Sequence, residues 1–299
     1  MIDVRRLRVL REVALRSSLT AAAAVLEYTP SAVSQQIAAL ERETGVALLE
    51  RRGRGIVLTP SARALLKHAD VVLAQLERAE AELATHTGQL GGTLRLGAFA
   101  TGLLDLVPKA LTQLAVVAPD IAVHVTEAEP DEALPALISH VFDIAIGFEY
   151  DLVAGPQIDG LYRRDLLIDP MIAVGVPAAA RPGPVGLDEL AMERWLLPPE
   201  DTYCGQLVRR ACEAAGFKPE PAAICQDFRG LAALANAGLG VALVPTLALT
   251  PDARRSATAL VPGLARRLFA AVRDGAEEHP VLATTLTAFA HAAATPLPA

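Results

Sequence analysis

Apolar residues recur at helical spacing through the first forty positions of the chain. They form two short segments, 19–26 and 30–40, that only three residues separate. In the second segment Val33, Ile37 and Leu40 stand at i, i+4 and i+7, so they make one apolar stripe along a helix. Ser31, Ser34 and Gln35 point away from this stripe, so the outer face of the helix is polar. A similar pattern near the N-terminus predicts one more helix, and we expect the three helices to share a small core.

The turn between these two segments ends in Thr29-Pro30, which is a helix start signal. A threonine hydroxyl can cap free backbone amides, and the fixed φ of proline suits the first helical position. Two short helices joined by a brief turn are typical of a helix-turn-helix, whose second helix enters the major groove of DNA. An ordinary helical hairpin is the alternative. The residues expected at base edges or adjacent phosphates are Thr29, Pro30, Ser31, Ser34 and Gln35.

A charged turn follows the predicted recognition helix. The stretch from Glu41 to Gly45 is typical of a helix end with glycine as the stop, and two short apolar runs then flank a turn rich in arginine and glycine. This pattern predicts a two-stranded wing. A charged turn is often only solvated surface, but beside a helix-turn-helix we expect contact with phosphate or the minor groove. The residues expected to make it are Arg51, Arg52 and Arg54.

Thr59-Pro60 repeats the start signal and opens a long predicted helix over 60–88. Apolar residues along it are spaced 4, 3, 4, 3 and 4 positions apart, which is a heptad seam of period 3.5. A helix that packs only within its own domain usually shows a wider stripe of period 3.6, so this narrow seam favours association between subunits. The seam consists of Leu65, Ala69, Val72, Leu76, Ala79 and Leu83.

From Thr93 onward the pattern changes to buried strands that alternate with helices. Strands expected at 94–98, 121–125 and 142–147 predict a βαβαβ unit, and hence a parallel sheet covered on both faces. A second round follows, with strands expected at 171–176, 195–197, 222–225, 241–244 and 268–272. The order implies an α/β domain of two Rossmann-like lobes with a cleft between them.

Charge is distributed unevenly along the chain, and this supports contact between the N-terminal segment and DNA. The chain has 299 residues, too many for one typical domain, and a net charge of −7. Residues 1–60 hold nine Arg against six Asp or Glu, a balance of +3, so the remainder carries −7 − 3 = −10. A basic end on an acidic chain is expected where one domain meets phosphate and the other does not.

Other classes of protein fit the sequence less well. The window 231–250 has no charge, but its Asn, Gly and Pro residues suit a helix, a turn and a buried strand better than a membrane span. The six histidines show no metal-ligand spacing, and no glycine-flanked nucleophile elbow occurs, so we expect no enzymatic activity, metal or cofactor. A solute-binding protein would explain two lobes but not the first 90 residues.

Taken together, these motifs resemble the LysR-type transcriptional regulators over essentially the whole chain. The matching segments of the first domain are Leu19-Thr20-Ala21-Ala22-Ala23, Pro30-Ser31-Ala32-Val33-Ser34-Gln35-Gln36-Ile37, Leu40-Glu41, Gly45-Val46-Ala47-Leu48-Leu49-Glu50-Arg51 and Leu58-Thr59-Pro60. Those of the second are Gly92-Thr93-Leu94-Arg95-Leu96-Gly97, Phe142-Asp143-Ile144-Ala145-Ile146 and Ala237-Gly238-Leu239-Gly240-Val241-Ala242-Leu243-Val244-Pro245.

The resemblance implies three parts: an all-α winged helix-turn-helix domain at 1–59, a linker and dimerisation helix at 60–88, and a two-lobed effector domain similar to periplasmic binding proteins at 89–299. It implies a cytoplasmic, bacterial regulator that binds an interrupted palindrome in double-stranded DNA as a dimer or a dimer of dimers, with RNA polymerase as a further partner. A small molecule in the interlobe cleft is then expected to change how the DNA is held.

The same resemblance places the effector beside the loop after the first effector strand, where Thr101 and free amides precede a helix. Arg229 is the candidate bidentate partner for an anionic effector. Ordinary packing or surface exposure is the alternative for each of these residues taken singly. The expected effector contacts are Ala100, Thr101, Gly102, Phe148, Thr202, Tyr203, Phe228 and Arg229.

Some positions depart from the family's pattern. Thr29 stands where Gln is frequent and Gln35 where a basic residue is common, so the operator sequence does not carry over. Ala62 stands where Gly is usual, and we expect the linker helix to keep its role. Cys204 and Cys212 lie where peroxide-sensing members hold a cysteine pair, although their spacing is one residue shorter. On a helix they would lie about 12 Å apart, too far for a disulfide without local unfolding. A cysteine-based redox sensor is the alternative regulator.

Overall fold

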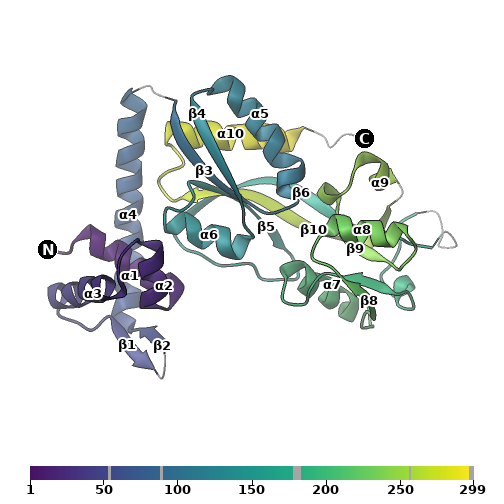
Figure 1. The fold of residues 1–299 in the computed structure, drawn as a ribbon, viewed down its shortest axis with the longest axis horizontal. Coiled ribbons are helices and arrows are strands. Elements are labelled where there is room, and N and C mark those ends of the chain that lie inside the picture. The colour runs from purple at the N-terminus through teal and green to yellow at the C-terminus, as the bar shows by residue number, and fades with distance from the viewer. Residues whose placement is uncertain (53–54, 88–89, 178–182, 256, 296–299) are drawn as a thin grey trace.

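The computed structural model describes residues 1–52, 55–87, 90–177, 183–255 and 257–295, and it places a small helical domain beside a larger α/β domain (Figure 1). In the small domain Leu10, Val33 and Leu40 are fully buried in one core. Its elements are α1 (Val4–Arg16), α2 (Leu19–Val25), α3 (Pro30–Thr44), β1 (Leu49–Arg52) and β2 (Gly55–Leu58).

Side chains cap the N-termini of α1 and α3. The Asp3 carboxylate accepts a hydrogen bond from the Arg5 amide at 2.8 Å, and Thr29 Oγ1 accepts one from the Ala32 amide at 3.2 Å. Gly45 ends α3 with a φ of 72°, in the left-handed region that glycine adopts without steric cost. The predicted three-helix core is therefore confirmed.

The long helix α4 (Pro60–Thr87) joins the small domain to the larger one (Figure 1). Near its start Ala62 and Ala69 are buried in the core of the small domain. Farther along, Arg78 forms an ion pair with Asp274 of the larger domain, with 3.4 Å between the guanidinium nitrogen and the carboxylate oxygen. The helix thus contacts both domains.

A six-stranded sheet in the order β4-β3-β5-β10-β6-β9 forms the centre of the larger domain. The strands β3, β4 and β5 are parallel, as expected, whereas β10 runs antiparallel to both β5 and β6. One face packs against α5 and α10 and the other against α6, since Ile144 and Ile146 join the first cluster and Ala145 the second. The elements of this lobe are β3 (Gly92–Ala98), η1 (Gly102–Leu104), α5 (Leu106–Val117), β4 (Ile121–Glu127), α6 (Pro130–Ile138), β5 (Ile144–Tyr150) and α10 (Pro280–Ala294).

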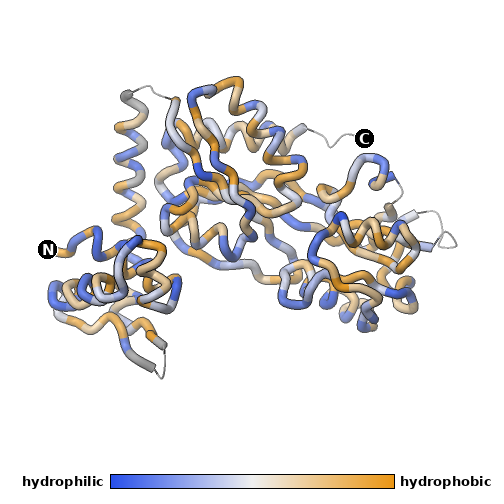
Figure 2. The backbone as a smooth tube through the Cα atoms, in the orientation of Figure 1, coloured by the Kyte–Doolittle hydropathy of each residue, from blue (hydrophilic) through white to orange (hydrophobic). Residues whose placement is uncertain are grey.

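The second lobe shares this sheet. The strand β6 (Leu161–Val174) pairs with β10 (Thr258–Arg273) and, through its C-terminal part, with the edge strand β9 (Ala242–Pro245). The two long strands β6 and β10 therefore connect the lobes. Apolar side chains of α8 cover β6 and β9, and Figure 2 shows apolar segments gathered there. The remaining elements are η2 (Asp188–Leu190), β7 (Trp195–Leu197), α7 (Tyr203–Ala214), β8 (Pro221–Ile224), α8 (Phe228–Asn236), η3 (Thr246–Ala248) and α9 (Pro251–Arg255).

The structure differs from the sequence expectation in the length of two strands. The run 171–176 begins in the C-terminal part of β6 and continues past its end at Val174, and 268–272 falls in the C-terminal part of β10; the two strands span 14 and 16 residues. In the part of each strand that precedes its run, side chains alternate between the two faces of the sheet and some are charged. These parts therefore contain no apolar run long enough to predict a strand. The window 231–250 forms most of α8, a turn at Gly238 and β9, as predicted. No helix in the described ranges is long and apolar enough to span a membrane.

Candidate functional site

The outer face of α3 is polar and open. Val33, Ile37 and Leu40 are buried beneath it, whereas Ser34 and Gln35 are exposed. The remaining residues expected at DNA, Thr29, Pro30 and Ser31, are also exposed, and they lie at the N-terminus of the same helix. The helix therefore offers a row of short hydrogen-bonding side chains, of the kind that reaches base edges in a major groove.

The wing is attached to α3 by a side chain that sequence analysis did not single out. Glu41 Oε1 accepts hydrogen bonds from the amides of Leu48 at 2.8 Å and Leu49 at 3.3 Å. At the same end of the hairpin, just after β2, Thr59 Oγ1 donates to the Ala47 carbonyl at 2.8 Å. The predicted β1–β2 hairpin is present. The side chains of Arg51 and Arg52 and the whole of Arg54 lie outside the described residues.

The heptad seam of α4 divides into two parts. Leu65 and Ala69 pack on the core of the small domain. Beyond them the seam is open to solvent: Val72, Leu76 and Leu83 are 41%, 37% and 67% exposed, and Ala79 is exposed as well. Because α4 continues as an exposed helix with an apolar stripe, this part of the seam can pair with another helix.

Register explains a polar cluster between the lobes. Arg266 of β10 stands directly opposite Tyr150 of β5 on one side and Asp169 of β6 on the other. Residues opposite one another in paired strands project from the same face. Three strands therefore bring a phenol, a guanidinium and a carboxylate into one row, and all three side chains are buried.

Arg266 is the centre of this cluster. Its Nε and Nη2 lie 2.9 and 2.8 Å from Asp169 Oδ2, and Nη2 also donates to Thr101 Oγ1 at 2.7 Å. The Leu247 amide donates to Asp169 Oδ1 at 3.1 Å. Burial raises the pKa of the Asp169 carboxyl. The positive charge of Arg266 opposes that rise, and the hydrogen bonds donated by Arg266 and by the Leu247 amide favour the carboxylate form. The pair is thus a buried charge pair that also fixes the predicted residue Thr101.

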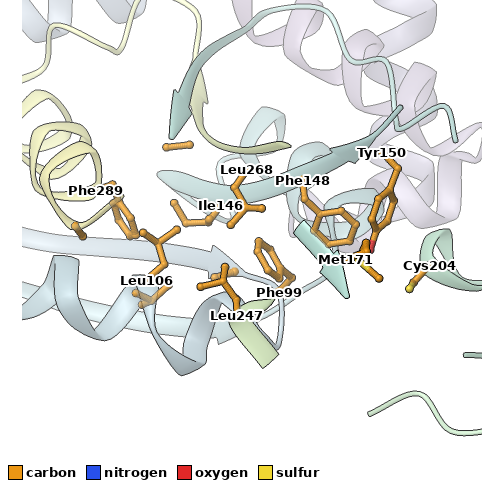
Figure 3. Close-up of a cluster of buried hydrophobic side chains, with 14 of the residues drawn as sticks. Phe99, Leu106, Ile146, Phe148, Tyr150, Met171, Cys204, Leu247, Leu268 and Phe289 are labelled. Atoms are coloured by element: carbon orange, nitrogen blue, oxygen red, sulfur yellow. The ribbon is translucent and has the colours of Figure 1, made fainter. Parts of the chain in front are cut away.

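Aromatic rings surround the guanidinium. Arg266 lies 4.9 Å from the ring centroid of Phe99 and 5.2 Å from that of Phe148, within cation–π range. Phe148 also makes edge contacts with Phe99, Tyr150 and Tyr203 at centroid distances of 4.9, 5.3 and 6.5 Å. Figure 3 shows Phe99, Phe148 and Tyr150 in one group, with Cys204 beyond the tyrosine. The structure thus joins the predicted residues Thr101, Phe148 and Tyr203.

Two further polar groups, Tyr150 and Glu129, adjoin this cluster. The Tyr150 hydroxyl is buried and has no hydrogen-bond partner of good geometry in the described part of the chain. Burial raises its pKa well above the ordinary value, and the Cys204 thiol adds to the rise. Burial also raises the pKa of the Glu129 carboxyl against the opposing charge of Arg266, and Asp131 adds to the rise.

The other predicted effector residues have separate positions. Thr202 caps α7, because its Oγ1 accepts from the Gly205 amide at 3.0 Å and donates to the Pro199 carbonyl at 2.7 Å. Ala100 is exposed and Gly102 begins η1 beside Thr101. Phe228 is partly buried and packs against both the main core and the second-lobe core, and Arg229 is exposed at the start of α8.

Sequence analysis missed Tyr150, Asp169 and Arg266, and weighed Cys204 only for redox chemistry. A signal was present in the charged residues that stand one or two positions before the apolar runs of β6 and β10. That signal shows only that a charge adjoins a buried strand. The partner of each charge depends on a register between strands 97 residues apart.

The comparisons with known proteins agree with this architecture. A family described as "Bacterial regulatory helix-turn-helix protein, lysR family" matches residues 4–63, and a family described as "LysR substrate binding domain" matches residues 87–294. The chain belongs to the LysR family. It is a LysR-type DNA-binding transcriptional regulator with a substrate-binding domain, and the family consists of transcriptional regulators.

Relatives of this LysR-type regulator span most of its length. The transcriptional regulator ClcR of Pseudomonas putida is 30% identical over 251 residues, which cover 82% of this chain and 83% of that protein. A probable hydrogen peroxide-inducible genes activator of Mycobacterium avium is 32% identical over 275 residues, covering 90% and 84%. Both alignments thus span more than four fifths of each chain.

Solved structures share the fold. A full-length OxyR variant from Pseudomonas aeruginosa superposes with a TM-score of 0.64 at 20% identity, covering 97% of this chain and 95% of that one. Full-length CbnR in complex with its target DNA gives a TM-score of 0.52 at 20% identity, covering 97% and 100%. At this identity the likeness concerns the fold alone.

The two cysteines of the alternative regulator lie on α7 and are both buried. Burial raises the pKa of Cys204 to about 12 and that of Cys212 to about 12. Because the thiolate is the reactive form of cysteine, burial disfavours the reactive form of both thiols.

Proposed function

We propose that this LysR-type regulator binds an interrupted palindrome through two copies of α3, one from each subunit of a dimer. Ser31, Ser34 and Gln35 are exposed on α3 and can hydrogen-bond base edges. Thr29 and Pro30 stand at the helix N-terminus, where backbone amides favour a phosphate. Arg51, Arg52 and Arg54 add wing contacts to phosphate or the minor groove.

The subunits pair through the exposed part of the α4 seam, from Val72 to Leu83. An apolar stripe of period 3.5 on an exposed helix supports this proposal, because a second copy of the same helix buries it. A two-fold axis through that pair relates two recognition helices, which is the arrangement that a palindromic site mirrors. The assembly is a dimer or a dimer of such dimers.

A small-molecule effector binds between the two lobes, at the polar cluster around Thr101 and Arg266. The long strands β6 and β10 pass through this region, so a ligand that prefers one arrangement of the lobes shifts the population toward it. The lobes then reorient the α4 helices and change half-site spacing or DNA bend. The regulator acts in the bacterial cytoplasm, with RNA polymerase as a partner.

The observation that carries this function is the exposed polar face of α3 in a helix-turn-helix that matches the family. Fluorescence anisotropy on a bound DNA site tests it. We expect Gln35→Ala to change the base preference, and Arg52→Ala to weaken all sequences and lower the salt slope by about one unit. Arg194→Ala, at an exposed position in the other domain, removes an equal charge and serves as control. An unchanged salt slope in Arg52→Ala would contradict the wing contact.

The redox alternative has its own test. The buried, protonated thiols predict that iodoacetamide labels Cys204 and Cys212 slowly, and equally before and after treatment with hydrogen peroxide. Labelling that peroxide abolishes would support a redox sensor instead.

A further inference from the structure

Arg6 of α1 ties that helix to the recognition helix α3. Its Nε donates to the side-chain oxygen of Gln36, Oε1, at 3.2 Å, and its Nη1 forms an ion pair with Glu43. The side chains of Arg6 and Glu43 are 25% and 23% exposed, so both lie at the edge of the small domain. Gln36 and Glu43 stand seven positions apart and share one flank of α3. Arg6 thus spans two turns of the recognition helix.

The contact with Arg6 fixes which end of the Gln36 amide is left for another partner. An arginine nitrogen can only donate a hydrogen bond, so the amide atom that it faces is the oxygen. The two N–H groups on Nε2 then point elsewhere. Gln36 is partly exposed, and its Nε2 makes no hydrogen bond with any residue in the described ranges. The group that Gln36 offers is therefore a donor.

The flank of α3 around Gln36 has room for a DNA strand. Ala32 and Ala39 are its neighbours on this flank, four positions before it and three after it, and both are partly exposed. Their side chains end at Cβ, so they leave the amide of Gln36 projecting beyond them. When a recognition helix lies in the major groove, its outer face meets base edges, and side chains on its flanks can reach the phosphates that border the groove.

A phosphate is the partner that matches this donor. Glutamine reads adenine through a pair of bonds in which its oxygen accepts and its nitrogen donates. The oxygen of Gln36 is held by Arg6, which disfavours that pair, whereas a phosphate oxygen needs only a donor. The surrounding charge also suits an anion: Arg5 and Arg8 are exposed on the same helix as Arg6, and the carboxylate of Glu43 is paired.

We propose that Gln36 donates a hydrogen bond from Nε2 to a phosphate of the bound DNA, with Arg6 holding the amide in this orientation. The contact adds affinity and fixes the register of α3 on the duplex, but it does not read the base sequence. This inference rests on the proposed function in placing α3 in the major groove.

Gln36→Met tests the contact, because it keeps the length of the side chain and removes the donor. Fluorescence anisotropy measures binding to a DNA site captured from genomic fragments and to a duplex of unrelated sequence, over a range of salt concentrations. We expect about a tenfold loss on both duplexes, with an unchanged salt slope because a neutral donor releases no counter-ion. Gln113→Met, the same change at a partly buried position of α5, should bind both duplexes within twofold of the wild type.

Methylphosphonate substitution of the captured site, one phosphate at a time, locates the contact. At one phosphate in each half-site the substitution should weaken the wild type about tenfold more than it weakens Gln36→Met, since the two partners of one bond are coupled. Gln36→Glu keeps an acceptor for Arg6 but has no donor. It should therefore melt no lower than the wild type and still bind both duplexes at least tenfold more weakly.

Four results overturn the inference: wild-type affinity of Gln36→Met or Gln36→Glu, a loss confined to the captured site, additive losses at every phosphate, or a lower melting temperature of Gln36→Glu. If specific binding to the captured site persists alongside any of them, the regulator stands and only the assignment of Gln36 is wrong. A wild-type protein that captures no site contradicts the proposed function itself, and the inference fails with it.

Discussion

The buried pair of Asp169 and Arg266 gives the sharpest prediction for stability. Asp169→Asn keeps the shape of the side chain and one acceptor oxygen, but it removes the charge opposite a guanidinium that is 1% exposed. Breaking a buried ion pair by removing one partner costs about 3–5 kcal/mol, because the remaining charge is left uncompensated in a poorly solvated site. For a domain of roughly 200 residues this lowers the melting temperature by about 6–20 °C.

The assay is thermal unfolding of the full-length protein followed by circular dichroism at one fixed protein concentration. A matched control lies next along β10, where Arg267 pairs with Asp151 at 3.2 Å and both side chains are more than half exposed. Asp151→Asn should change the unfolding free energy by less than about 0.5 kcal/mol.

A double variant isolates the charge effect. Combining Asp169→Asn with Arg266→Gln removes both charges, so it should be more stable than Asp169→Asn alone, with a coupling of about 1 kcal/mol or more. If Asp169→Asn melts like Asp151→Asn, the guanidinium is not held by the carboxylate in solution and the description of the interlobe cluster is wrong.

Three other predictions concern assembly, DNA and pH. Leu76→Glu buries an unpaired charge in the seam at a cost of about 3 kcal/mol, so it should weaken dimerisation about 100-fold. Gln75→Glu, beside the seam, should leave the mass measured by light scattering unchanged. Glu41→Ala should weaken DNA binding in anisotropy about tenfold by loosening the wing, while Glu43→Ala, which removes an equal charge from α3, should not weaken it. Burial raises the pKa of the Glu129 carboxyl in the folded protein. The protonated carboxyl therefore contributes to stability below the ordinary carboxyl pKa, and this contribution is lost as the pH rises through the pKa of the folded state. Glu129→Gln should accordingly raise the melting temperature at pH 7 and leave it unchanged at pH 4. Each prediction has a contradicting outcome: a stable dimer of Leu76→Glu, unchanged DNA affinity of Glu41→Ala, or equal shifts of the Glu129→Gln melting temperature at pH 7 and pH 4.

Local signals were sufficient for the DNA-binding domain. Thr29 and Gly45 mark the ends of α3 through interactions within one helical turn, so sequence spacing alone predicts where the helix begins and ends. The same reasoning predicted the exposed face of α3, because the period of Val33, Ile37 and Leu40 leaves the intervening positions outside the core. It did not identify Glu41 as the attachment of the wing, since its acceptor role depends on where the hairpin folds back.

The interlobe cluster required tertiary information. Thr101 and Phe148 were predicted from the resemblance, but Asp169 and Arg266 stand in strands whose charged halves break the apolar pattern. Their contact follows from antiparallel register, which is set by long-range pairing and not by neighbours in the chain. For the same reason the sequence suggested an anion site at Arg229 and did not reveal that Arg266 is buried and paired with Asp169.

The central claim is that this LysR-type regulator recognises specific DNA sites as a symmetric assembly. Its most direct test is affinity capture of fragments of its own genome by the purified protein at moderate salt, followed by sequencing. We predict enrichment of a few sites that contain an interrupted palindrome. Uniform, weak binding with no enriched site would contradict the claim.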